Sequence, residues 1–124
     1  MNELTLSSLG HTWFLDLDGT IVKHNGYKVD GHDTLLDGAI EFIQNLPTDD
    51  MIVFITSRSY EYKESTEKFL DENGVRYDSI IYNTPFGERI LVNDCKPSGL
   101  KTAFAVNGKR DGRVDIMVRI DEKL

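Results

Sequence analysis

The sequence is short of the features that would place it in several large classes of protein. It contains a single cysteine, Cys95, so it cannot form an internal disulfide, which favours a reducing, cytoplasmic setting. No apolar run reaches the length of about 18 residues that a membrane span requires, so no membrane segment is predicted. The first residues, MNELTLSSLGH, lack a basic start and a long apolar stretch, so a cleaved secretion signal is not expected.

Positive charge is also scarce. The chain has 14 Lys and Arg residues against 21 Asp and Glu residues, which gives a formal net charge of −7. Such a surface repels a polyphosphate backbone, and no cluster of basic residues offsets it, so nucleic-acid binding is not expected. The same field opposes any anionic substrate, so a phosphate site would need a local positive charge from a metal or from backbone N–H groups.

The length and composition are those of one folded domain. The chain has 124 residues, of which 40% are hydrophobic and 28% are charged. These values allow a real core and do not suggest disorder. We therefore treat residues 1–124 as a single domain.

Apolar runs and turn residues alternate along the chain. WFLDL (13–17) and MIVFIT (51–56) are typical of strands, and the second is apolar enough to be buried on both faces. Apolar residues at helical spacing over 36–46, and the segment 59–73 that ends before Gly74, predict helices. This order predicts an α/β fold: a Rossmann-like, open, mostly parallel sheet with right-handed crossovers and helices on both faces. Ligands bind at the carboxyl ends of the strands in such sheets.

The remaining segments are less regular. Residues 19–36 are rich in glycine and turn formers and are expected to form an irregular flap or a short hairpin. ILVN (90–93) is interpreted as a parallel strand. SIIY (79–82) is then a peripheral strand, because NTPFGER is too short for the parallel crossover of about a dozen residues that would join the two. Residues 102–120 are expected to form a hairpin or a pair of edge strands.

Two aspartates, Asp16 and Asp18, follow the first apolar run. Residues i and i+2 of an extended segment point the same way, so their carboxylates would lie side by side. They would repel each other unless a cation lay between them, and oxygen ligands suit magnesium. A solvated acidic turn is the plain alternative.

The stretch DLDGTIV resembles the first motif of the haloacid dehalogenase superfamily, in which DxDGT follows an apolar strand. The resemblance implies a phosphomonoester hydrolase that uses Mg²⁺. Asp16 would be the nucleophile that forms an aspartyl-phosphate, and Asp18 would be the general acid/base. Gly19 and Thr20 complete the motif and would line the substrate, while Asp16 and Asp18 would also bind the metal.

The superfamily's second motif is a Thr or Ser that ends the next core strand, which matches Thr56. Its hydroxyl would bind a phosphoryl oxygen, although alone it would be read as a helix cap. Ser57 follows Thr56 and would also bind the substrate. Arg58 either grips a substrate phosphate or faces solvent.

The fourth motif supplies an acid for the metal, and Asp94 at the end of ILVND matches it, although a capping turn aspartate is the alternative. The third motif is a lysine, for which Lys96 is the better candidate. Arg89 would begin the strand over 90–93, and at about 3.3 Å per residue it would lie roughly 16 Å from Asp94. The order differs from the usual one, because the lysine follows the acid.

No length is left for a cap domain between these motifs. Members without a cap act on bulky substrates or use a partner protein or a second copy of the chain as a lid. The pattern is also similar to small bacterial phosphatases of sugar-phosphate or capsule biosynthesis, which points to a phosphorylated small molecule. The alternative function is a non-catalytic regulatory module of the same fold that binds metal and phosphate.

Overall fold

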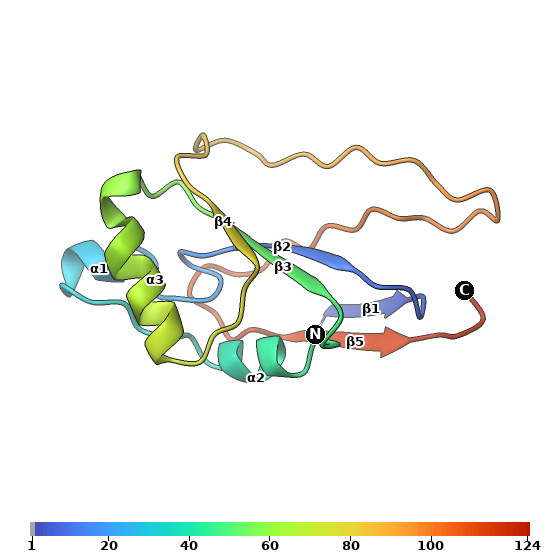
Figure 1. Ribbon diagram of the computed structural model, residues 1–124, viewed down its shortest axis with the longest axis horizontal. Helices are drawn as coiled ribbons and strands as arrows, with labels where there is room; N and C mark the ends of the chain where they lie inside the picture. The colour runs from blue at the N-terminus through green and yellow to red at the C-terminus, as the bar shows by residue number, and fades with distance from the viewer. Residues whose placement is uncertain (1) are drawn as a thin grey trace.

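The chain is built around two separate parallel sheets (Figure 1). The computed structural model describes residues 2–124. The larger sheet has the order β2-β3-β4 and contains β2 (Thr12–Asp16), β3 (Met51–Ile55) and β4 (Ser79–Ile81). The smaller sheet pairs β1 (Asn2–Leu6) with β5 (Ile116–Ile120). Every strand pair within the two sheets is parallel, so the prediction of an α/β fold with parallel strands is confirmed.

The helices are few and short. They are α1 (Gly26–Val29), α2 (Ala39–Gln44), the 3-10 turn η1 (Tyr60–Tyr62) and α3 (Lys63–Glu72). The helices predicted over 36–46 and 59–73 are thus present with shorter bounds. Gly38 has a φ of 77°, which is outside the helical region and stops α2 from extending further back. No helix within residues 2–124 is long and apolar enough to cross a membrane.

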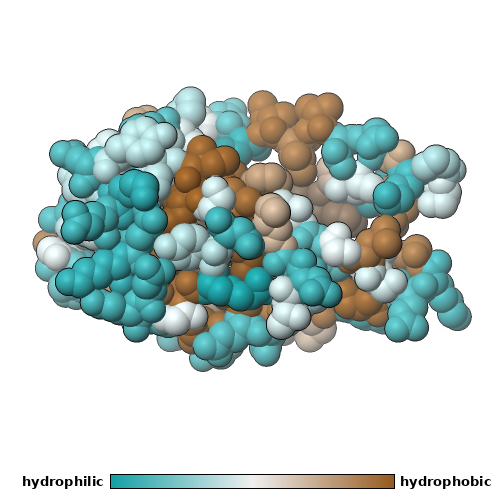
Figure 2. Space-filling model, in the orientation of Figure 1, coloured by the Kyte–Doolittle hydropathy of each residue, from teal (hydrophilic) through white to brown (hydrophobic). Residues whose placement is uncertain are grey.

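Residues 82–115 form a long connection without helix or strand, which Figure 1 shows running out from β4 and back towards β5. The prediction of a strand at 90–93 is therefore wrong, and of the hairpin or pair of edge strands expected over 102–120 only the strand β5 is present. The parallel neighbour of β3 is β4 and not ILVN. The NTPFGER stretch after β4 is too short to return the chain to the start of a further parallel strand, so ILVN does not join the sheet. Ile90 and Val92 are 85% and 89% exposed, and Figure 2 shows hydrophobic surface along the edge where this segment runs.

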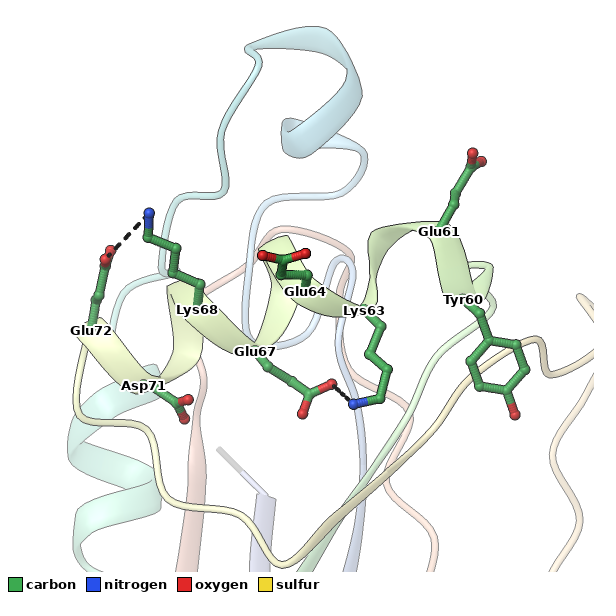
Figure 3. A pocket seen from close by; sticks show the side chains of 8 residues that line it. All are labelled: Tyr60, Glu61, Lys63, Glu64, Glu67, Lys68, Asp71 and Glu72. Carbon is green, nitrogen blue, oxygen red and sulfur yellow. Dashed lines mark ion pairs between the residues drawn. The ribbon is translucent and has the colours of Figure 1, made fainter.

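The outer face of α3 is charged (Figure 3). Two ion pairs at i, i+4 spacing, Lys63–Glu67 and Lys68–Glu72, run along it. Such exposed pairs contribute a few tenths of a kcal/mol each, so they support the helix only weakly. The shallow hollow on this face contains none of the residues that the sequence singled out, and we assign it no function.

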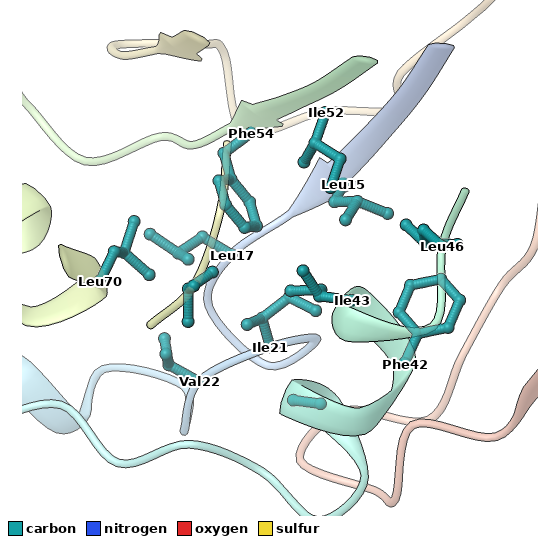
Figure 4. Close-up of a cluster of buried hydrophobic side chains, with 12 residues drawn as sticks. Leu15, Leu17, Ile21, Val22, Phe42, Ile43, Leu46, Ile52, Phe54 and Leu70 are labelled. Carbon is teal, nitrogen blue, oxygen red and sulfur yellow. The ribbon is translucent and has the colours of Figure 1, made fainter. Parts of the chain in front are cut away.

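Both larger helices pack on the same face of the larger sheet (Figure 4). Phe42 and Ile43 of α2 and Leu70 of α3 share one core with Leu15 of β2 and Phe54 of β3. The strands follow one another across the sheet in a single direction, and right-handed crossovers then place successive helices on one side. The expectation of helices on both faces is therefore not met.

Asp50 is a buried carboxylate that ties the start of β3 to β2. It is 3% exposed, and it accepts hydrogen bonds from Trp13 Nε1 at 2.9 Å and from the backbone N–H of His11 at 3.1 Å. The ring nitrogen Nδ1 of His11 lies 3.0 Å from Oδ1 and 2.9 Å from Oδ2 of Asp50. Burial alone would raise the pKa of Asp50, but the hydrogen bonds from Trp13 and His11 outweigh it and lower the pKa.

This carboxylate is expected to make stability depend on acid pH. Because its pKa is lowered in the folded state, its contribution is complete above the ordinary value of 3.8 and is lost as the pH falls through the folded pKa. At neutral pH, Asp50→Asn should reduce the free energy of unfolding by about 1–3 kcal/mol, and the difference should shrink in acid. Urea unfolding at a series of pH values measures this. The exposed neighbour variant Asp49→Asn should show no such trend, and a difference for Asp50→Asn that is constant with pH would refute the assignment.

Candidate active site

Three strands end at one edge of the larger sheet and bring polar side chains together there. Asp16, the last residue of β2, lies opposite Ile55 of β3, which in turn lies opposite Ile81 of β4. The residues that follow therefore continue side by side, and the N–H of Thr84 donates to the carbonyl of Thr56 at 3.1 Å. This carboxyl edge is where open parallel sheets bind ligands.

A tight turn after β2 presents the aspartates. The backbone N–H groups of Ile21 and Val22 both donate to the carbonyl of Leu17, at 2.9 and 3.1 Å. All three of these side chains are buried in the core, whereas the aspartates lie at least partly in solvent. Gly19 has a φ of 85°, a conformation that a residue with a side chain rarely adopts. The alternation of apolar and polar residues in DLDGTIV thus anchors the turn and exposes its carboxylates.

Asp16 is the accessible carboxylate of the pair. Its side chain is 38% exposed. One oxygen accepts a hydrogen bond from Thr20 Oγ1 at 2.9 Å, and the other is paired with Arg89 Nη1 at 2.7 Å. The carboxylate is therefore oriented by two donors and remains open to solvent.

Asp18 faces a buried arginine instead. Arg58 donates from Nε and Nη2 to the two oxygens of Asp18, at 3.0 and 2.9 Å. The same guanidinium holds both oxygens of Asp33, at 3.0 and 2.7 Å, and donates to Thr66 Oγ1 at 2.9 Å. The ring of Tyr27 stacks on it, 3.9 Å from the ring centroid to Cζ.

Arg58 is thus part of the framework of the site. Burial alone would lower the pKa of Arg58, but the hydrogen bonds to Asp18 and Asp33 outweigh it and raise the pKa above its ordinary value. Every N–H group of the guanidinium is engaged, which leaves none free for a substrate phosphate. Because Tyr27 and Asp33 belong to residues 19–36, Arg58 also fixes the flap beside Asp18.

The hydroxyl groups at the edge divide into a buried and an accessible set. Thr56 is 1% exposed, and its Oγ1 accepts the backbone N–H of Arg58 at 3.1 Å. Ser57 is half-buried, and its Oγ lies 3.3 Å from Thr84 Oγ1, which also accepts from Arg89 Nη2 at 3.3 Å. Ser57 and Thr84 therefore lie in one hydrogen-bond chain with Arg89 and Asp16, whereas Thr56 caps the turn below them.

Asp94 and Lys96 are not gathered with the aspartates. Both are exposed in the connection between β4 and β5. The Asp94 carbonyl accepts from Thr102 Oγ1, and the Lys96 N–H donates to the carbonyl of Leu100 at 2.9 Å. Among residues 2–124, neither side chain forms a hydrogen bond or ion pair with Asp16 or Asp18, and no three His, Cys, Asp or Glu side chains are arranged to hold a metal ion.

The carboxylates that could hold a cation are therefore Asp16 and Asp18. Each of their oxygens accepts one hydrogen bond, and a carboxylate offers about four lone-pair positions, so both retain acceptor capacity. Mg²⁺ is commonly bound through one or two carboxylates, with water and substrate phosphate completing its shell. The donor set fits such a metal, with Asp94 outside it.

Comparisons with known proteins find no relative. No family model, no curated protein and no solved structure matches the chain. The chemistry of the site is therefore inferred from the residues and their geometry.

The sequence analysis gave three residues of this site no role or the wrong position. Arg89 was set aside because it was expected to begin a strand over 90–93, whereas the irregular connection carries it back to Asp16. Asp33 and Thr84 had no distinguishing sequence pattern. The signal that could have found Arg89 was the requirement for a local positive charge in an acidic chain.

Proposed function

We propose that the protein is a magnesium-dependent phosphomonoester hydrolase of the haloacid dehalogenase type. The observation that carries the proposal is the half-exposed carboxylate of Asp16 at the end of a parallel strand. It is oriented by Thr20 and Arg89, and Asp18 follows two residues on. The finer description of the fold as Rossmann-like and without a cap domain belongs to the same proposal, as does a cytoplasmic location.

In the first step, an oxygen of Asp16 attacks the substrate phosphorus and the bond to the leaving oxygen breaks. Asp18, carrying a proton, donates it to that oxygen, so the alcohol departs neutral and an aspartyl-phosphate remains. A protonated carboxyl group still accepts hydrogen bonds, so Asp18 can stay oriented by Arg58 while it carries the proton.

In the second step, a water molecule attacks phosphorus and the bond to Asp16 breaks. Asp18, now ionised, takes the proton of the water and is restored to its starting state. Arg89 stands where negative charge gathers on the transferring group and, with the hydroxyls of Ser57 and Thr84, can orient its oxygens. Mg²⁺ held by Asp16 and Asp18 would neutralise the phosphoryl charge and oppose the repulsion of an acidic protein.

The substrate class is proposed from the openness of the site. The flap of residues 19–36 is fixed by Arg58 and contains only the short helix α1, so it leaves room for a bulky phosphorylated metabolite such as a sugar phosphate. A second copy of the chain or a partner protein would then serve as the lid.

Phosphate release from a panel of sugar phosphates, nucleotides and an aryl phosphate, with and without Mg²⁺, tests the proposal. Release from at least one substrate that requires the metal is the expected result. No release from any substrate, together with retained binding of Mg²⁺ and inorganic phosphate, would favour the non-catalytic binding module. The observation that favours this second function is that Arg58 donates hydrogen bonds to both oxygens of Asp18.

Substitutions of Arg89 and Lys96 test which residue supplies the positive charge at the site. Because Arg89 is paired with Asp16 at 2.7 Å, Arg89→Gln should lower kcat/KM by about 100-fold or more, as removal of a donor at a developing charge does. Lys96→Gln removes a positive charge from the same connection and serves as the matched control. If Lys96→Gln were the more damaging change, the lysine expected from the sequence would be the functional cation, and this geometry would not represent the working site.

A further inference from the structure

Residues Arg110 and Asp111 lie against the turn that presents the aspartates, although they are far along the chain. The N–H of Asp111 donates to the carbonyl of Gly19 at 2.9 Å, and its Oδ1 accepts the backbone N–H of His24 at 2.7 Å. These bonds join the turn, the flap and the connection before β5. Asp111 and Arg110 therefore lie beside the turn that carries Asp16 and Asp18.

Arg110 packs directly on Gly19. A Cβ placed on Gly19 would lie 3.1 Å from Arg110 Cγ and 3.8 Å from Arg110 Nε. Gly19 stands between Asp18 and Thr20, and Thr20 is hydrogen-bonded to Asp16. The side chain of Arg110 thus lies against the backbone of the turn, on the segment that joins Asp18 to Thr20.

The guanidinium of Arg110 is not used by the protein. The residue is exposed, and among residues 2–124 it makes no ion pair and no hydrogen bond through its side chain. Arg58, Arg76 and Arg89 all have their guanidinium groups engaged by protein oxygens. In a chain with 21 acidic residues, a free arginine beside the site is the group best placed to receive an anion.

We propose that Arg110 binds a second anionic group of the substrate, so that the preferred substrate carries a carboxylate or a further phosphate in addition to the phosphate that is transferred. This inference rests on the proposed phosphatase function. Arg89 serves the phosphate at Asp16, and Arg110 serves a group on the leaving portion of the substrate. A planar guanidinium pairs with two oxygens of a carboxylate or a phosphate, so it selects for such a group and not for a neutral hydroxyl.

The test compares substrates that differ by one acidic group. Glucose 6-phosphate is compared with 6-phosphogluconate, which adds a carboxylate, and fructose 6-phosphate with fructose 1,6-bisphosphate, which adds a phosphate. For the wild type, kcat/KM should be higher for at least one diacid than for its partner by about 10- to 100-fold, the range of a hydrogen-bonded charge pair. The pair with the larger ratio identifies the second group as carboxylate or phosphate.

Arg110→Gln should abolish this ratio, and Arg110→Lys should restore part of it. Arg119→Gln removes an exposed arginine from β5 and should leave the ratio as in the wild type. Equal efficiencies within both wild-type pairs, or a ratio that survives in Arg110→Gln, would overturn the inference while leaving the hydrolase intact. No release from any of these substrates or from an aryl phosphate would overturn the proposed function and this inference together.

Discussion

Replacement of Arg58 by alanine is expected to lower the free energy of unfolding by about 3–5 kcal/mol. The guanidinium is 1% exposed and is the partner of Asp18 and Asp33, whose side chains are 16% and 6% exposed. Its removal leaves two carboxylates close together without a cation, in a region with little water to solvate them. Such uncompensated charges are among the few single changes that destabilise a domain this strongly.

The measurement is urea unfolding of the wild type and of Arg58→Ala. Arg119→Ala is the matched control, because that arginine is 69% exposed and its ion pair with Glu3 is long, at 3.9 Å, so a change of less than about 0.5 kcal/mol is expected. If Arg58→Ala does not fold, Asp33→Asn weakens the same network and should loosen the flap. Trypsin should then cut faster at Lys23 or Lys28. A loss below about 1 kcal/mol for Arg58→Ala would show that the network does not hold the flap.

Asp16→Asn should lower phosphate release by about a thousandfold or more, because removal of an enzymatic nucleophile typically leaves only the rate supplied by binding and charge stabilisation. An amide cannot attack phosphorus, yet it has the size of the carboxylate and can still accept the hydrogen bond of Thr20. The loss should therefore appear in kcat with the fold intact.

Circular dichroism and phosphate release of Asp16→Asn and of Asp49→Asn, an exposed aspartate before β3, separate chemistry from folding. The control variant should keep full activity. Should Asp16→Asn retain more than a tenth of the wild-type rate with the same metal dependence, Asp16 would not be the nucleophile, and the roles given to its neighbours would lose their basis.

The sequence predicted the elements whose local pattern and packing agree. β3 is apolar on both faces, α3 ends just before a glycine, and the DLDGT turn places its apolar residues in the core, so each was found with its approximate bounds. The pair Asp16 and Asp18 was found for the same reason, because a strand that ends in carboxylates is unusual by itself.

The parts that depended on distant pairing were not predictable in this way. β1 was missed because NELTL is short and pairs only with β5, at the far end of the chain. ILVN has strand composition, but β4 already occupies the position beside β3. Arg58 and Arg89 were misjudged because the partners of an arginine come from other segments. Asp33 and Asp16 are 25 and 73 residues away from them, respectively, along the chain.

The most direct test of the account is to look for the phosphoryl group on Asp16 itself. The protein is mixed with Mg²⁺ and the best substrate, quenched in acid during turnover, digested and analysed by mass spectrometry, with Asp16→Asn treated in parallel. We expect a phosphorylated peptide that contains Asp16 in the wild type and no phosphorylation in the variant. Rapid phosphate release without any phosphorylated peptide, or a phosphoryl group on another residue, would contradict the assignment of Asp16 as the nucleophile.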